Sequence, residues 1–229
     1  MRSKHQSLLA ILILLSGCAA RTQPLDLAAL RETRTVLVLP AGHPTSLESI
    51  DLSWGLLGLP GAAIAAGGTV PTAAGAPAAA AAEFTAELAR ALGASGWTVR
   101  LSSEPPARSE PTELLTTYKA VPGSDGAVVF DSVIFDAGYI AGTFRAYRPI
   151  LRVWTRLVEP SSGKTLYAQR FIYGINPLAG PERFVGEADD RYYFSTSAEL
   201  AADPDRAVAG LRAGLQRIAS AIADDLKRP

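Results

Sequence analysis

The most constraining feature of this 229-residue chain is its only cysteine, Cys18, which closely follows an uncharged apolar run. That run covers residues 8–15 (LLAILILL) and is preceded by the basic residues Arg2 and Lys4. Eight apolar residues are too few to cross a bilayer core, which takes about 20, so the stretch is typical of an export signal. A single cysteine also excludes an intrachain disulfide. The fold must therefore be stabilised by an ordinary hydrophobic core, for which about 200 residues suffice.

The residues around Cys18 resemble a known signature. The sequence LSGC at 15–18 is similar to the lipobox of bacterial lipoproteins, in which small residues precede an invariant cysteine. The resemblance implies that residues 1–17 are a cleaved signal peptide and that Cys18 is then acylated, as with palmitate, on sulfur and on its new amino terminus. Several acyl chains anchor a protein stably, whereas one does so only marginally. Ala19, in place of an aspartate, favours the outer membrane. A general secretory signal with an incidental cysteine is the alternative.

Charge limits the partners that the mature chain would bind. Removing residues 1–17 takes away two of the 22 basic side chains and none of the 22 acidic ones, which leaves a net charge of −2. No basic excess exists to attract nucleic acid or anionic lipid. We therefore expect a lipid-anchored protein of the cell envelope that faces the periplasm, with orientation at the cell surface left open.

Composition divides the mature chain into two parts, the second of which contains an unusual insertion. Residues 18–33 are mixed and polar, as expected of a lipidated amino terminus and tether. Residues 34–229 suit a single α/β domain. Within it, residues 52–82 carry no charged side chain, but prolines and glycines divide them into pieces too short for a continuous apolar helix. We interpret this insertion as a loop and short helix packed on the domain. An apolar flap that contacts a membrane or a partner is the alternative.

Hydrophobic periodicity predicts the order of the elements. Apolar runs and alternating patterns indicate strands, and apolar residues recurring at threes and fours indicate helices. The expected strands cover 35–39, 97–101, 125–135, 147–158 and 165–173, and the expected helices cover 77–92 and 203–226. This order predicts a mixed β-sheet with flanking helices and a long C-terminal helix.

Few residues suit catalysis. His43 is the only histidine of the mature chain, and the sequence lacks GxSxG, HExxH and glycine-rich phosphate-loop motifs. The acidic pairs at 189–190 and 224–225 lack the spacing of a calcium loop and are interpreted as solvated. We therefore expect no enzyme, no cofactor and no metal site, with a hydrolase that uses His43 as the remaining alternative.

The hairpin near residue 160 offers a candidate binding surface. If the turn at 160–163 pairs Glu159 with Lys164, guanidinium and aromatic groups meet across the two strands. Such surfaces resemble the cores of protein interfaces. The alternative is that a helix or residues 139–147 cover this face. The expected cross-strand pairs are Arg156 with Tyr167, Trp154 with Gln169, and Arg152 with Phe171.

Several stretches together resemble one family. The lipobox, TVLVLP, DGAVVFDSV and YRPILRVWTRLVEPSSGKTLYAQRF are similar to the periplasmic lipoprotein group around the curli secretion component CsgG, the TolB N-terminal domain and the penicillin-binding-protein activator LpoB. The resemblance implies a non-enzymatic protein that binds another envelope protein. It equally implies a self-associating subunit of an oligomeric envelope secretion or transport assembly.

Overall fold

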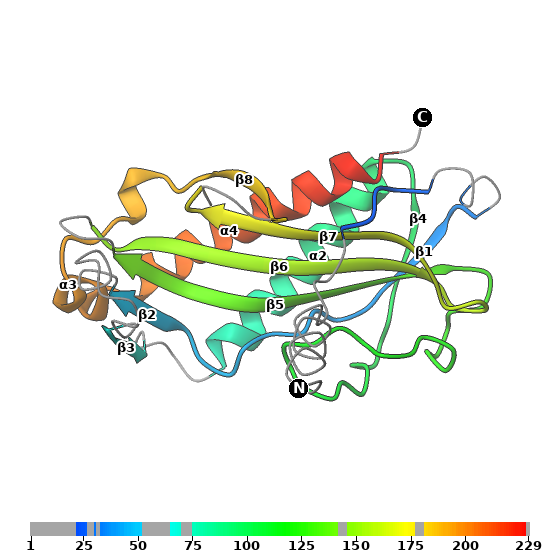
Figure 1. Cartoon of the computed structure of the whole chain (residues 1–229), viewed down its shortest axis with the longest axis horizontal. Helices are drawn as coiled ribbons and strands as arrows, with labels where there is room; N and C mark the ends of the chain where they lie inside the picture. Colours follow the sequence, from blue (N-terminus) through cyan, green and yellow to red (C-terminus); the bar gives the residue numbers. More distant parts are fainter. Residues whose placement is uncertain are drawn as a thin grey trace, which may run out of the picture.

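The computed structural model describes residues 22–26, 30, 33–51, 65–69, 75–141, 146–176 and 181–227. Within these residues, a sheet of long strands is backed by two long helices (Figure 1). The strands are β1 (Thr35–Val38), β2 (Glu48–Asp51), β3 (Ala65–Thr69), β4 (Thr98–Leu101), β5 (Val128–Ala141), β6 (Arg148–Glu159), β7 (Lys164–Gly174) and β8 (Arg183–Glu187). The helices are α2 (Ala76–Ala94), α3 (Ser197–Ala202) and α4 (Pro204–Asp225), with a 3-10 turn η1 (Asp190–Tyr192).

Strand β5 organises the sheet. It pairs antiparallel with β6, which pairs antiparallel with β7. Its other edge pairs in parallel with β1 near its start and with β2 near its end. Strand β4 adds to β1, β3 to β2 and β8 to β7. Parallel and antiparallel pairs thus share one sheet, and the predicted mixed α/β fold is confirmed.

Helices α2 and α4 cover one face of the sheet, which we call the helix face. As predicted, Asp203 caps α4 by accepting a hydrogen bond from the Arg206 amide at 3.1 Å, and Pro204 occupies the first turn. The predicted stripe of α2 is also confirmed, because Phe84, Leu88 and Leu92 are all buried. Burying one such side chain contributes about 1.5–3 kcal/mol, so the packing of this layer stabilises the fold. The buried apolar side chains of α4 include Leu211, Leu215, Ile218 and Ile222.

The charge-free insertion at 52–82 is partly described. Residues 65–69 form β3, and residues 76–82 belong to α2. Residues 52–64 and 70–74 lie outside the described residues, so the apolar-flap alternative stays a prediction. Among the described residues, no helix has the length and apolarity needed to cross a bilayer.

The opposite face of the sheet is covered at one end by residues 102–126, which follow β4 (Figure 1, green). Leu115 and Tyr118 from this segment join a buried cluster with Leu37, Leu39 and Val129 of the β1 and β5 region. The prolines of this segment predict a loop over 102–112, which the structure confirms, but a short helix expected around 112–118 is wrong, because the backbone there is irregular. The loop nevertheless has a packing role, since it buries one end of this face.

Part of the predicted tether belongs to the sheet. The amide of Gln23 donates to the Ala168 carbonyl at 2.7 Å, and the Ala168 amide donates back at 3.0 Å. Asp26 forms an ion pair with Lys164 at 2.8 Å. Residues 22–26 therefore lie along the edge of β7, and only residues 19–21 intervene in the sequence between this segment and Cys18.

Candidate functional site

The face of the sheet opposite the helices carries a ladder of arginine and tryptophan. Along β6, Arg152, Trp154 and Arg156 alternate with the buried residues that face the helices, and each is half-buried. Across the strand, Trp154 lies opposite Arg170 of β7. The Arg170 guanidinium stacks over the Trp154 ring with its carbon 4.5 Å from the ring centre. We call these four residues the arginine face.

The predicted cross-strand pairs are wrong by one residue. The turn does pair Glu159 with Lys164, but a β-bulge between Leu157 and Val158 shifts the register that follows. A shift of one residue moves every side chain to the other face of a strand. Tyr167 and Phe171 consequently point to the helix face and are buried there. The observed pairs are Arg156 with Ala168, Trp154 with Arg170, and Arg152 with Ile172.

The arginine face is only partly neutralised. Arg152 forms ion pairs with Asp136 at 3.3 Å and with Glu182 at 3.8 Å. Within the described part of the chain, Arg156 and Arg170 form no ion pair, and the Nε atom of Arg170 is buried with no hydrogen-bond partner. Unpaired buried donors are rare in folded proteins. The face therefore retains positive charge and hydrogen-bonding capacity next to an indole ring.

A buried ion pair lies beside this face. The Arg108 guanidinium donates to Asp131 Oδ1 at 2.7 Å, with the two side chains 7% and 0% exposed. The other Asp131 oxygen accepts from the Leu115 amide and the Tyr118 hydroxyl, each at 2.9 Å. Burial, together with the negative charge of Asp131, raises the pKa of Tyr118 well above its usual value, so the hydroxyl remains a donor. This network holds residues 102–126 on the sheet and is complete by itself.

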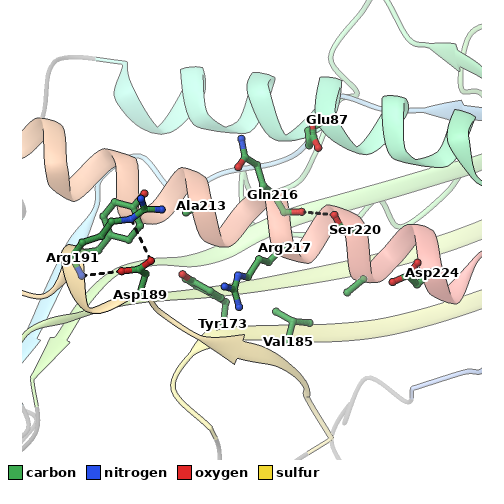
Figure 2. Close-up of a pocket in the computed structure, with 12 residues that line it drawn as sticks. Glu87, Tyr173, Val185, Asp189, Arg191, Ala213, Gln216, Arg217, Ser220 and Asp224 are labelled. Atoms are coloured by element: carbon green, nitrogen blue, oxygen red, sulfur yellow. Dashed lines mark hydrogen bonds and ion pairs between the residues drawn. The ribbon is translucent and has the colours of Figure 1, made fainter.

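A second candidate site is a cleft between α4, β8 and η1, with a volume of about 650 Å³ (Figure 2). Such a volume is typical of sites for small molecules. Tyr173, at the end of β7, and Arg217, on α4, lie in its middle, and Asp224 lies towards one end (Figure 2). Gln216 and Ser220 add polar groups from α4.

Glycines make room for the side chains of this cleft. A Cβ atom at Gly214 would lie 2.3 Å from the Tyr173 ring, so only glycine lets this ring rest against α4. Gly186 of β8 has a φ of 130°, and a Cβ there would lie 2.9 Å from an Arg217 guanidinium nitrogen. Burial raises the pKa of Tyr173, and the charge of Arg217 partly opposes that rise. Tyr173 therefore presents a protonated hydroxyl close to a cation.

The other predicted residues lie apart from both sites. His43 is half-buried, and its Nδ1 lies 3.0 Å from the Pro44 carbonyl oxygen. Among the described residues, no group of three or more metal-ligating side chains gathers. Asp224 is exposed as predicted, but the interpretation of Asp225 as solvated is wrong, because it is half-buried, pairs with Arg183 and accepts from the Tyr167 hydroxyl. Cys18 lies outside the described residues.

Sequence reasoning missed the cleft because its residues come from four separate segments. The one local signal was Gly210 and Gly214, two glycines spaced by four within the apolar stripe of α4. A helix interior tolerates glycine at a cost of about 1 kcal/mol, so such a pair indicates that something packs closely there. Here the closely packed groups are the rings of Tyr139, Tyr173 and Tyr192.

Neither a protein-family model nor a curated protein matches the sequence. Similar solved structures include the PelC dodecamer from Paraburkholderia phytofirmans, 13% identical, with 91% of this chain and 96% of that chain covered and a TM-score of 0.40. Another is a protein from Xanthomonas campestris of the DUF330 family, 10% identical, with 90% of each chain covered and a TM-score of 0.44. At similarities this low, a functional argument has to come from the chain's own residues.

Proposed function

We propose that this chain is a non-enzymatic lipoprotein of the bacterial envelope, anchored in the outer membrane by acylation of Cys18 and facing the periplasm. It binds another envelope protein through the arginine face. The observation that carries the proposal is the pairing of Trp154 with Arg170, whose buried Nε has no partner among the described residues. Tryptophan and arginine dominate the binding energy of protein interfaces.

The chemistry of the face indicates the kind of partner. Arg156 and Arg170 are half-buried cations without a carboxylate partner in the described chain. An arginine fork binds carboxylates in pairs of parallel hydrogen bonds, and its flat surface stacks on aromatic rings. The partner should therefore present acidic side chains around an apolar centre that covers Trp154.

The tether sets where this binding takes place. Residues 22–26 lie along β7, so only residues 19–21 separate the acylated Cys18 from this segment, a span of four residue steps. A fully extended chain spans no more than about 3.6 Å per residue, which limits this distance to about 14 Å. The domain is thus held against the membrane surface by the β7 edge, and the partner must be within reach of that surface.

The resemblance to the group around CsgG, TolB and LpoB agrees with a binding role and stays a prediction. Its alternative is a subunit of an oligomeric secretion or transport assembly, in which the arginine face would contact another copy of the chain. The two candidates differ in particle size, because a ring of subunits is several times larger than a single domain. Mass photometry of the detergent-solubilised protein separates them.

Crosslinking in intact cells tests the partner proposal. A photoreactive residue is placed at Arg156 in one strain and at Arg212, an exposed position of α4, in another. We expect a covalent adduct with one envelope protein from position 156 and none from position 212. The substitution Arg170→Glu should remove that adduct while leaving the circular dichroism spectrum unchanged. The same adducts from both positions, or none from position 156 of an acylated and folded protein, would reject the arginine face as the binding surface.

A further inference from the structure

The cleft of Figure 2 has polar groups that the fold does not use. Tyr173 is 1% exposed, yet its hydroxyl has no hydrogen-bond partner among the described residues. Arg217, beside it, likewise makes no ion pair or hydrogen bond within the described chain. The hydroxyl of this buried tyrosine and the exposed Arg217 guanidinium line one cleft, and both can donate to an acceptor that the described part of the chain does not supply.

The charges around the cleft identify which groups are free. Arg191 pairs with Asp189 at 3.4 Å, and Glu87 pairs with Arg90. These four charges are thus compensated within the chain. Arg217 is left as the free cation of the cleft and Asp224 as its free carboxylate, among the residues that the structure describes.

The distance between these two charged residues indicates the length of a ligand that contacts both. Residues 217 and 224 are two helical turns apart on one side of α4, about 10.5 Å along the axis at 1.5 Å per residue. An extended peptide of three residues spans about the same distance, at roughly 3.3–3.6 Å per residue. Ser220 lies between these two residues along α4, where the backbone of such a ligand would pass (Figure 2).

We propose that this cleft binds short peptides that have a free amino group and a free α-carboxylate. The carboxylate accepts hydrogen bonds from the Arg217 guanidinium and the Tyr173 hydroxyl, and the amino group lies near the Asp224 carboxylate. A carboxylate is the ligand group best suited to Arg217, because a planar guanidinium can donate two parallel hydrogen bonds to a carboxylate. The inference goes beyond the proposed function and does not depend on it, since the cleft lies on the helix side of the sheet.

The test uses the purified full-length protein in detergent and three probes, namely trialanine, its C-terminal amide and its N-acetyl form. Titration calorimetry should show binding of trialanine, weakened about tenfold or more by C-terminal amidation or by Arg217→Ala. Tyr173→Phe should weaken binding about threefold to tenfold without changing the fold, because that hydroxyl has no partner within the described part of the chain. N-acetylation and Asp224→Ala should each have an effect of a few fold, because an exposed ion pair contributes little.

Matched controls keep the result interpretable. Arg212→Ala removes another arginine of α4, one that pairs with Glu83, and should leave trialanine binding unchanged. Trp154→Ala alters the arginine face and should also leave it unchanged, so failure of either proposal can be recognised separately. The inference is overturned if the amide binds as tightly as the free acid. It is equally overturned if trialanine fails to bind at millimolar concentration, or if galacturonate, an acid without an amino group, binds as tightly as trialanine.

Discussion

Arg108 and Arg217 occupy opposite situations in the same domain. Arg108 is almost fully buried and donates to Asp131 and to the carbonyl oxygens of Pro40, Glu113 and Ser132, all within 3.3 Å. Arg217 lines an open cleft and, among the described residues, donates to none. The first arginine has its partners in the chain and holds a loop on the sheet. The second has none among the described residues, so it can bind a ligand without breaking a described contact of the fold.

The largest effect should follow from removing the partner of Arg108. Asp131→Ala leaves a buried guanidinium without its carboxylate, which typically costs about 3–5 kcal/mol in the free energy of unfolding. Urea denaturation followed by circular dichroism measures this loss. Glu83→Ala breaks the exposed ion pair with Arg212 and serves as the control, with an expected loss of about 0–1 kcal/mol. Equal losses in the two variants would show that the Arg108 network does not hold the fold together.

Tyr118 and Tyr173 show the same contrast, with smaller expected effects on stability. Tyr118→Phe removes a hydrogen bond to the buried Asp131 carboxylate and should cost about 1.5–3 kcal/mol in the free energy of unfolding. Tyr173→Phe removes a hydroxyl that has no hydrogen-bond partner among the described residues and should change this free energy by less than about 0.5 kcal/mol. Thermal and urea unfolding of the two variants provides the measurement. A larger loss for Tyr173→Phe than for Tyr118→Phe would reverse the assignment of structural and ligand-binding roles.

Alkaline pH should destabilise the folded protein through its buried tyrosines. Burial raises the pKa values of Tyr118, Tyr139 and Tyr167, so these hydroxyls stay protonated in the folded protein while their unfolded counterparts ionise near pH 10. Their contribution is complete below pH 10 and is lost as pH rises above it, by about 1.4 kcal/mol per pH unit for each tyrosine. Urea unfolding at pH 8, 10 and 11 measures the slope, which Tyr118→Phe should reduce. Tyrosinate absorbance that develops fully near pH 10 in the folded protein would contradict this reasoning.

The smallest effect on stability is expected at Arg217, which has no partner among the described residues. Arg217→Ala removes no described hydrogen bond or ion pair, so the free energy of unfolding should change by less than about 0.5 kcal/mol. Differential scanning calorimetry of Arg217→Ala and Asp131→Ala under the same conditions compares the two losses of stability directly. A loss comparable to that of Asp131→Ala would mean that Arg217 serves the fold rather than a ligand.

Local patterns in the sequence predicted the helix side of this domain well. The cap at Asp203, the proline at 204 and the apolar stripe that follows are all local signals, and α4 forms as they indicate. The turn at 160–163 and its pairing of Glu159 with Lys164 were predicted for the same reason. Each of these elements is specified by residues that are close together in the chain.

The sites were less predictable because they depend on contacts between distant residues. One extra residue in β7, Leu166, at the bulge opposite Leu157 and Val158 moved Tyr167 and Phe171 to the helix face, and turn chemistry alone could not reveal it. The partner of Asp131 lies 23 residues away in a proline-rich loop, where no periodic pattern marks Arg108. An aspartate inside the apolar run VVFDSVIF was the one available sign of a buried ion pair.

The proposed lipid anchor at Cys18 would place both sites at a membrane, and it is the part of the proposed function on which the rest depends. Trypsin cleaves after Arg21, so the mature protein should release the tetrapeptide of residues 18–21. Mass spectrometry of this peptide from the native protein should show three fatty acyl chains, two of them carried by the Cys18 sulfur. A peptide with a free thiol, or an amino terminus at another residue, would contradict a lipid-anchored envelope protein.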